Sequence, residues 1–324
     1  MIAANHVWLL AVAMLIDALV GDPDGLWRRI PHPVALIGRL VALLDRLLNH
    51  ARAGATGQRL LGVVAVVILV TIAGGIGYAL ERAFMALPFG WIGTAVIAAI
   101  LLAGRSLYDH VAAVADAFPQ GIDAARAAVS RIVGRDPASL DEPRICRAAI
   151  ESTAENFSDG VVAPALWFLL LGLPGLFAYK AINTADSMIG HLTTRHRDFG
   201  WAAARLDDLV NLPASRLAGA LIAIAAPLGG GRASIAFRTM LADAGKHRSP
   251  NAGWPEAAMA AALGIALAGP RRYAGILVSD PFLNEGGRRE ATPDDIRRAL
   301  RVYVGASVAL FAVAVSAAVT VLLP

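Results

Sequence analysis

Residues 60–80 read LLGVVAVVILVTIAGGIGYAL, and no charged side chain interrupts the run. A helix needs about 20 predominantly apolar residues to cross the roughly 30 Å hydrocarbon core of a bilayer. A run of this length and apolar character is typical of a membrane-spanning helix. The stretch therefore indicates an integral membrane protein.

The overall composition agrees with a membrane protein. The 324 residues are 57% hydrophobic and 17% charged, with a mean hydropathy of +0.59, whereas soluble domains are roughly 25% charged. The net charge of +4 fits basic loops that set membrane topology and contact anionic lipids. Because the sequence contains no aromatic-and-basic nucleic-acid module, we expect the lipid bilayer, and no nucleic acid, as a partner.

The other apolar segments predict a single membrane-embedded unit covering residues 1–324. We expect about five membrane segments, drawn from apolar stretches near residues 7–20, 60–80, 91–103, 163–179, 217–228 and 302–323. Whether the number of membrane crossings is odd or even stays open, because the segments at 163–179 and 217–228 could each cross the membrane or fold back. Arginine concentrates in the long loops, which the positive-inside rule places in the cytoplasm. The sequence thus predicts an all-α polytopic protein of the inner (cytoplasmic) membrane, with helical cytoplasmic loops.

The segment at residues 163–179 is broken by Gly172, Pro174 and Gly175. Each half is too short to span a bilayer by itself. The pattern fits a re-entrant hairpin, which is tolerated only where protein covers the backbone or where the backbone lines a wet cavity. An ordinary kinked span is the alternative.

An acidic run, ESTAENFSDG, occupies residues 151–160. In a helix, Glu151, Glu155 and Asp159 would follow one another at i, i+4 and i+8 on one face. Three stacked carboxylates repel one another unless a positive charge lies against them. Carboxylate and amide oxygens suit Mg²⁺, which commonly bridges to substrate phosphates. The alternative is a solvated acidic face.

Two further acid and amide groups follow the broken segment. Asn183 and Asp186 share a helical face, although they could also form a helix cap. Asp207 and Asn211 are spaced i, i+4, and Asp207 is adjacent to Asp208. Adjacent carboxylates are typical of a metal site, but a solvated helix end with internal ion pairs has the same spacing.

A cationic group lies in the Gly/Pro-rich loop at residues 243–256. It consists of Lys246, His247 and Arg248. Such side chains hold phosphate groups in proteins, and contact with lipid headgroups is the alternative. The sequence has no G-x-x-x-x-G-K-[ST] loop and no G-x-G-x-x-G motif. A nucleotide would therefore bind without those devices.

Taken together, these segments resemble the CobD/CbiB family of cobalamin biosynthesis, the adenosylcobinamide-phosphate synthases. The resemblance covers nearly the whole chain, and its specificity comes from the number and order of the motifs. It rests on Asp17 with GDP at 21–23, PHPV at 31–34 with IG at 37–38, VGRD at 133–136, residues 151–164, NTADSM at 183–188, FG at 199–200 with ARLDD at 204–208, and residues 243–256. The run NLPASR at 211–216 departs from the family's more usual N-Y-(L/I)-P-A-R pattern, so Arg216 is a softer assignment.

The resemblance implies that a propionate carboxylate of adenosylcobyric acid is joined to aminopropanol or its phosphate. ATP and Mg²⁺ are the implied helpers. Because a carboxylate is a poor electrophile, ATP would convert it to an acyl phosphate. That step needs a metal, cations for the phosphate and a base for the incoming ammonium. The resemblance is also compatible with a homo-oligomer or with a complex with other enzymes of the pathway.

We assign roles to the residues from this chemistry, and the resemblance does not supply them. The candidate catalytic groups are Glu151, Glu155, Asp186 and His247. The candidate substrate- or phosphate-binding groups are Arg205, Lys246, Arg248, Asn156, Asn183 and Asn251. The candidate metal ligands are Glu155, Asp159, Asp207 and Asp208.

Two competing functions use similar features. A membrane transporter would also need broken helices and charges within the membrane, but no inverted repeat is visible and most charge lies in loops. A membrane sensor similar to the AmpE-like proteins would share the architecture without ligase activity. The sensor interpretation predicts that the acidic and cationic groups can be neutralised without loss of function.

Overall fold

The computed structural model describes residues 2–50, 53–133, 140–191, 193–273, 276–278 and 280–322. The chain forms two compact units. Unit 1 comprises Met1–Ala103, Ala163–Asn211 and Ala314–Pro324, and unit 2 comprises Gly104–Val162 and Leu212–Val313. Helices dominate both units, which confirms the all-α prediction.

Within the described residues, five helical stretches are long and apolar enough to cross a membrane. They are Gly54–Met85, Trp91–Gln120, Glu142–Ile189, Trp201–Gly229 and Pro293–Thr320. The stretch His6–Val20 is a shorter apolar helix. Five of the six predicted apolar segments lie within these stretches, the sixth (302–323) overlaps Pro293–Thr320, and the polytopic membrane architecture is confirmed.

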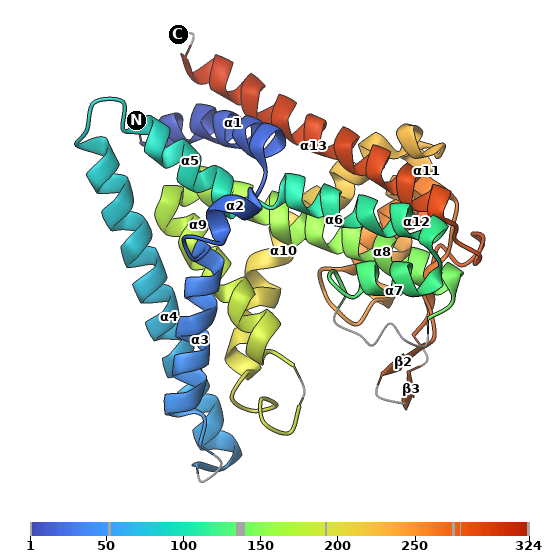
Figure 1. Cartoon of the computed structure of the whole chain (residues 1–324), viewed down its shortest axis with the longest axis horizontal. Coiled ribbons are helices and arrows are strands. Elements are labelled where there is room, and N and C mark those ends of the chain that lie inside the picture. Colours follow the sequence, from blue (N-terminus) through green and yellow to red (C-terminus); the bar gives the residue numbers. More distant parts are fainter. Residues whose placement is uncertain are drawn as a thin grey trace. The chain divides into compact units, whose positions relative to one another are not determined.

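Unit 1 is a bundle built around helix α9 (Figure 1). Its other helices are α1 (Ile2–Val20), α2 (Asp24–Trp27), α3 (Pro33–Leu48), α4 (Gly54–Met85) and α5 (Trp91–Leu101), and the start of α10 (Trp201–Ala225) completes it. Helix α9 (Ala163–Ile189) packs against α1, α3, α4 and α5. The element that carries the broken apolar segment is therefore the centre of this unit.

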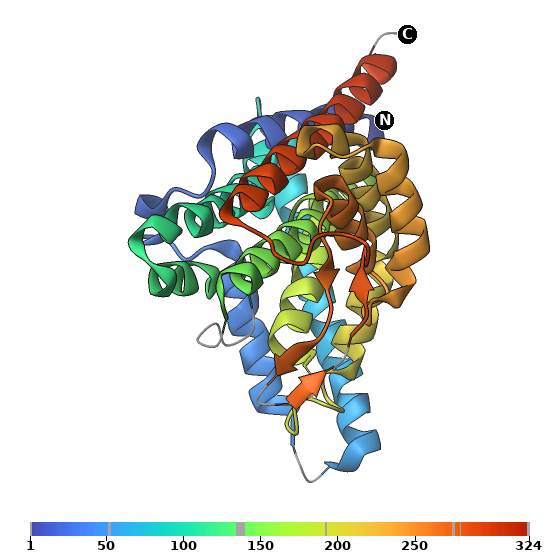
Figure 2. The ribbon, with the colours of Figure 1, turned by 90° about the vertical axis from the view of Figure 1, so that its right-hand side faces the viewer.

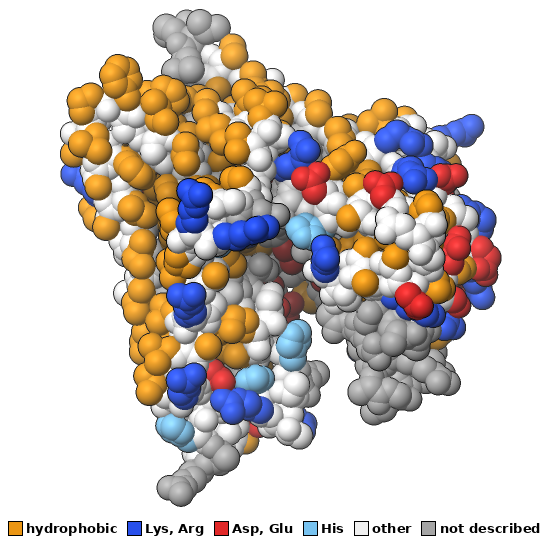
Figure 3. Space-filling model, in the orientation of Figure 1, with side chains coloured by type: hydrophobic (Ala, Val, Ile, Leu, Met, Phe, Trp, Pro, Cys, Tyr) orange, Lys and Arg blue, Asp and Glu red, His pale blue; other side chains and the backbone are white. Residues whose placement is uncertain are grey.

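Helix α4 contains the apolar run that decided the fold, and it extends beyond that run at both ends. It begins at Gly54 and ends at Met85, because the polar residues flanking the run remain helical outside its apolar part. Hydrophobic side chains cover this part of the molecule in Figure 3. Exposed apolar residues of α4 include Leu60, Val63, Val64, Val67, Ile68, Ile72 and Ile76. This surface fits contact with lipid chains.

Helix α9 is interrupted at Gly172, as both interpretations of the broken segment require. Gly172 has φ 67° and ψ −152°, a non-helical conformation between two helical halves. Pro174 follows directly in the second half and has no N–H to donate. This second half continues to Ile189, so the polar residues from Lys180 onward extend the helix.

Unit 2 packs around the short helix α12 (Gly253–Leu263), whose residues are nearly all buried. Its other helices are α6 (Gly104–Ala117), α7 (Ile122–Val129), α8 (Glu142–Phe157), the part of α10 from Leu212 onward, α11 (Ala233–Asp243) and most of α13 (Pro293–Leu322). Asp141 caps α8 by accepting a hydrogen bond from the Arg144 N–H. Short 3₁₀ turns occur at Phe118–Gln120, Ala226–Gly229 and Ala244–Lys246, and a π-helical turn at Ser158–Val162 follows α8.

The sequence did not predict the four short strands of unit 2, which Figure 2 draws as arrows. β1 (Leu267–Ala268) pairs antiparallel with β4 (Phe282–Leu283), and β2 (Arg271–Tyr273) pairs antiparallel with β3 (Ile276–Val278). Strands of two or three residues are too short to show a period-2 pattern, so a periodicity analysis does not find them.

Candidate functional site

The most connected group of predicted site residues lies in unit 1, where α9 meets the first part of α10. We call it the acid–amide cluster and define it as Tyr179, Asn183, Asp186, Asp207, Asp208 and Asn211. The Tyr179 hydroxyl donates to Asn211 Oδ1 at 2.9 Å. Asn211 Nδ2 in turn donates to Asp207 Oδ2 at 2.9 Å. Asn183 Nδ2 donates to the other carboxylate oxygen of Asp207 at 3.3 Å.

The centre of the acid–amide cluster is buried, and its edge is open to solvent. Tyr179 and Asn211 are each 1% exposed and Asp207 is 8% exposed, whereas Asp186 and Asp208 are half-buried. Asp207 interacts electrostatically with Asp186 and Asp208. Amide N–H groups of Asn183 and Asn211 are the described hydrogen-bond donors to Asp207. A buried carboxylate held by neutral donors and close to other acids is a good position for a cation or an amine.

Sequence spacing found part of this cluster. The predicted i, i+4 pair between Asp207 and Asn211 is present as a hydrogen bond. Arg205 and Asp208, spaced i, i+3, also form an ion pair, at 3.4 Å, with the Arg205 side chain 68% exposed. Tyr179 could not be predicted, because a tyrosine at the end of an apolar run gives no signal that its hydroxyl meets a residue 32 positions away.

A second group lies in unit 2 and includes a residue to which the sequence analysis gave no role. We call it the Arg216 group and define it as Ser215, Arg216, Asn251 and Trp254. The Arg216 guanidinium donates to Asn251 Oδ1 at 3.0 Å and lies 4.6 Å from the centre of the Trp254 ring. The buried Ser215 hydroxyl donates to the same amide oxygen at 3.1 Å. Arg216 also donates to the Leu212 carbonyl at 3.1 Å, so its described acceptors are neutral oxygens.

The predicted cationic residues of the 243–256 loop have acidic neighbours. Lys246 Nζ lies 2.7 Å from Asp243 Oδ1, and Arg248 Nε lies 3.3 Å from Asp280 Oδ1. Both ion pairs join a partly exposed cation to a largely covered carboxylate. His247 Nε2 lies 3.8 Å from Glu256 Oε1. His247 Nδ1 also accepts the N–H of Ser249 at 3.0 Å, which fixes the direction of the ring.

The three predicted carboxylates of the acidic run of residues 151–160 differ in their surroundings. Glu151 is buried, and its Oε1 accepts the Ala268 N–H at 2.8 Å. Glu155 and Asn156 are exposed, and Asp159 is half-buried. The α-helix ends at Phe157, and Asp159 belongs to the π-helical turn that follows it. Turns of this kind often occur at functional sites.

The four predicted metal ligands are divided between the units. Asp207 and Asp208 belong to unit 1, and Glu155 and Asp159 belong to unit 2. In the part of the chain that the structure describes, no group of three or more His, Cys, Asp or Glu side chains could by itself hold a metal ion. The carboxylate and amide oxygens of the acid–amide cluster still fit Mg²⁺. This ion is usually bound through one or two carboxylates, with waters and substrate phosphates completing its shell.

The fold and these polar groups define an all-α polytopic membrane protein with an acid–amide cluster and a cation-rich loop. A family model described as CobD/Cbib protein matches residues 10–303. The chain belongs to the CobD/CbiB family and to cobalamin biosynthesis, as the resemblance had implied. Part of the VGRD motif used for that resemblance, Gly134–Asp136, lies outside the described residues.

Curated relatives agree with the family model over most of their length. The chain is 53% identical to a "Cobalamin biosynthesis protein CobD" of Sinorhizobium sp, over 92% of this chain and 94% of that protein. It is 49% identical to the protein of the same name from Rhizobium meliloti (strain 1021), over 97% and 98%. For the Rhodobacter capsulatus protein of that name, identity is 48% over 92% and 93%. No solved structure matches the chain.

Proposed function

We propose that this protein joins a propionate carboxylate of adenosylcobyric acid to aminopropanol or its phosphate in an ATP-dependent amide synthesis. The observation that carries the proposal is the family match over residues 10–303. The acid–amide cluster and the Arg216 group support it, because they offer the negative and positive charges that this chemistry requires. The proposed location is the cytoplasmic face of the inner membrane, with a large amphipathic corrinoid as substrate.

The proposed reaction has two balanced steps. A carboxylate oxygen of the corrinoid first attacks the γ-phosphorus of ATP, a new C–O–P linkage forms and ADP leaves. The amine nitrogen then attacks the carbonyl carbon, the C–N bond forms and inorganic phosphate leaves with one oxygen of the original carboxylate. The substrate ammonium loses two protons on becoming the amide N–H. One of them ends on the phosphate, and a protein base or water accepts the other.

The acid–amide cluster fits a metal or an ammonium group. Asp186 and Asp208 are half-buried and can offer oxygens to an incoming cation, while Asp207 adds negative charge from the interior. Mg²⁺, when bound, would neutralise charge on the transferring phosphate. Asn183 and Asn211 hold the Asp207 carboxylate in one orientation through hydrogen bonds to its two oxygens.

The Arg216 group fits a phosphate. The Arg216 guanidinium is stacked on Trp254, and its described acceptors carry no negative charge. A guanidinium can donate two parallel N–H bonds to a phosphate. Lys246 and Arg248 remain candidates that would exchange a carboxylate partner for the phosphate. His247 is a candidate for the base, whereas Glu151 is engaged with the Ala268 N–H.

The proposal is tested with purified protein, ATP, Mg²⁺, adenosylcobyric acid and either aminopropanol or its phosphate. We expect an amide product and one ADP for each amide, and neither when ATP is omitted or Mg²⁺ is chelated. Glu155→Gln and Asp208→Asn should insert in the membrane but lose activity. Absence of an ATP-dependent amide would rule out the ligase and favour a transporter or a sensor. Full activity in both variants would refute the proposed metal ligands.

A further inference from the structure

The break in α9 is held by a charged side chain from another helix. At a helix start, the first N–H groups have no partner within the helix. Pro174 has no N–H, so Leu173 presents the first donor of the second half. The carboxylate of Glu81, near the end of α4, accepts this donor: Oε2 lies 3.0 Å from Leu173 N. Glu81 therefore caps the second half of α9 from 92 residues away in the sequence.

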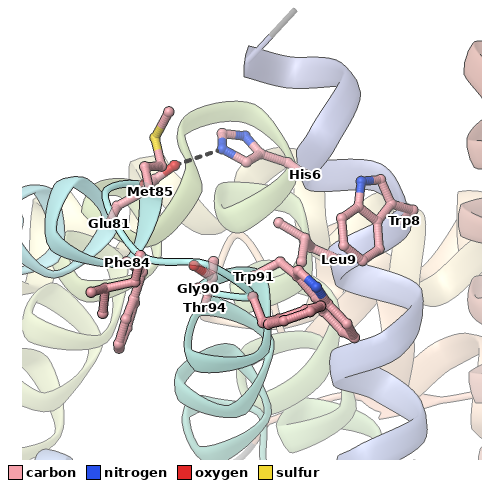
Figure 4. Close-up of a pocket in the computed structure, with 11 residues that line it drawn as sticks. His6, Trp8, Leu9, Glu81, Phe84, Met85, Gly90, Trp91 and Thr94 are labelled. Atoms are coloured by element: carbon pink, nitrogen blue, oxygen red, sulfur yellow. Dashed lines mark hydrogen bonds and ion pairs between the residues drawn. The ribbon is translucent and has the colours of Figure 1, made fainter.

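Glu81 is itself held by His6 of α1. His6 Nε2 lies 2.9 Å from Glu81 Oε1, and the two side chains are 5% and 13% exposed. Figure 4 shows this pair joined by a dashed line beside a cavity of about 320 Å³, which is also lined by Trp8, Trp91 and Thr94. The His6 ring lies 5.5 Å from the ring of Phe168, in the first half of α9. The His6–Glu81 pair thus contacts both halves of the broken helix.

The backbone around the break is closely packed. A Cβ on Gly172 would lie 2.5 Å from Glu81 Oε2 and 2.8 Å from His6 Cε1, and its φ of +67° disfavours any side chain. On α4, Gly77 approaches the break so closely that a Cβ there would lie 2.5 Å from the Leu173 carbonyl oxygen. Gly77 and Glu81 are spaced i, i+4, so one face of α4 both contacts and caps the break.

The direction of the second half of α9 determines where the acid–amide cluster forms. Tyr179, Asn183 and Asp186 all lie on this half, and two of them hydrogen-bond to side chains of α10. Asp186 is about 20 Å along the helix from Leu173 at 1.5 Å per residue. A change of about 10° in the helix direction would therefore move Asp186 by about 3.5 Å. Displacements of even 1 Å at a reacting group can cost about a hundredfold in rate.

Placing the ionisable His6–Glu81 pair near the end of a membrane helix also costs free energy. Burying a carboxylate and an imidazole among apolar side chains is unfavourable unless both find partners. Here the partners are each other and the backbone N–H at the break. We propose that Glu81, held by His6, is a positioning residue that fixes the break in α9 and thereby places Tyr179, Asn183 and Asp186 against α10. Its effect on catalysis rests on the proposed ligase function, but its effect on the helix does not.

The experiment measures the direction of the second half directly. Spin labels are placed at Tyr78, which is exposed on α4, and at Ser187, which is exposed near the end of α9, in a Cys146→Ala background. Double electron–electron resonance in nanodiscs should give one narrow distance distribution. In Glu81→Ala we expect a peak shift of about 3 Å or a doubled width, with the displacement scaled from the helix rise.

Matched variants separate the cap from general damage. Glu81→Gln keeps an oxygen acceptor and should restore the unmodified distribution. Gly77→Ala should disturb the distribution, whereas Gly75→Ala should not, because nothing lies within 4 Å of a Cβ there. If Glu81→Ala does not fold, the inference is tested with Gly77→Ala and His6→Ala, in which we expect the same shift or broadening of the distance distribution. An unmodified distribution in the folded variants would overturn the inference.

Activity supplies the second readout. In the unlabelled protein, Glu81→Ala should lower kcat for amide formation at least about tenfold while KM for ATP changes less than about threefold, and Glu81→Gln should recover most of the rate. A displaced helix with an unchanged kcat would also overturn the inference. If the unmodified protein forms no amide, the proposed function fails, and the distance measurement still decides whether Glu81 fixes the break.

Discussion

The acid–amide cluster of unit 1 and the Arg216 group of unit 2 each hold a charged side chain with neutral hydrogen-bond partners, and the two charges are opposite in sign. In the first, the described hydrogen-bond donors to buried Asp207 are neutral amides. In the second, Arg216 donates to neutral oxygens and stacks on Trp254. Lys246 and Arg248, by contrast, already lie against carboxylates. A charge that is oriented by neutral partners can still attract a ligand of opposite charge, whereas in an ion pair the partner neutralises most of that attraction.

The largest effect should follow removal of the negative charge in the acid–amide cluster. Asp207→Asn keeps the size of the side chain, and we expect the rate of amide formation to fall about a hundred- to a thousandfold. Thermal stability should change little, because removal of a buried charge is offset by loss of one of the two oxygens that accept from Asn183 and Asn211. A melting curve of the membrane-inserted protein provides the control. Activity within twofold of the unmodified protein would show that the Asp207 charge has no part in the reaction.

The next largest effect should follow removal of the positive charge in the Arg216 group. Arg216→Gln should raise KM for ATP about ten- to a hundredfold, since a charge-assisted phosphate contact contributes roughly 1.5–3 kcal/mol. The matched variants Lys246→Gln and Arg248→Gln should each raise it less than about threefold. Steady-state kinetics of the three variants give the order directly. The reverse order would mean that the ion-paired cations, and not Arg216, hold the phosphate.

A smaller effect should follow loss of the stacking partner. Trp254→Leu keeps an apolar side chain below Arg216 but removes the cation–π contact, which contributes roughly 0.5–2 kcal/mol. We expect KM for ATP to rise about three- to tenfold, with kcat nearly unchanged. If Trp254→Leu equals Arg216→Gln in effect, the ring orients the guanidinium more strongly than Asn251 does.

The smallest effect concerns Asp45 of α3, an acid that cations do compensate. Burial raises the pKa of Asp45, but hydrogen bonds from Asn49 and Arg195 and the charges of Arg195 and His196 outweigh burial, so the pKa lies below its ordinary value. A lowered native pKa stabilises the fold above the unfolded value near 3.9 and loses this contribution as pH falls further.

The free energies of unfolding of Asp45→Asn and the unmodified protein, obtained from melting curves, should therefore differ at pH 7 by less than about 1 kcal/mol, because Arg195 is largely exposed. The difference should shrink below about pH 4. A difference that grows as the solution becomes more acidic would contradict the assigned partners of Asp45.

The sequence was sufficient for features that depend on local spacing. The uninterrupted run at 60–80 predicted α4, the glycines and proline near 172–175 predicted the break in α9, and i, i+4 spacing predicted the contact between Asp207 and Asn211. Each of these depends on residues within one helix, where periodicity alone determines which side chains meet.

The rest depends on contacts between distant segments. Glu81 meets Leu173 across 92 positions, Glu151 meets Ala268 across 117, and Arg216 meets Asn251 across 35. No periodic pattern links such residues, because packing of separate elements brings them together. The π-helical turn at Ser158–Val162, which contains Asp159, was not predicted either, because periodicity does not distinguish it from the α-helix that it follows.

The central claim is that this chain forms an amide from a carboxylate activated by ATP. Its most direct test uses adenosylcobyric acid labelled with ¹⁸O in the reacting carboxylate, with ATP, Mg²⁺ and aminopropanol phosphate, and mass spectrometry of the released phosphate. The account predicts an ATP-dependent amide product and one ¹⁸O atom in each phosphate released. Amide formation without label in the phosphate, or no amide at all, would contradict it.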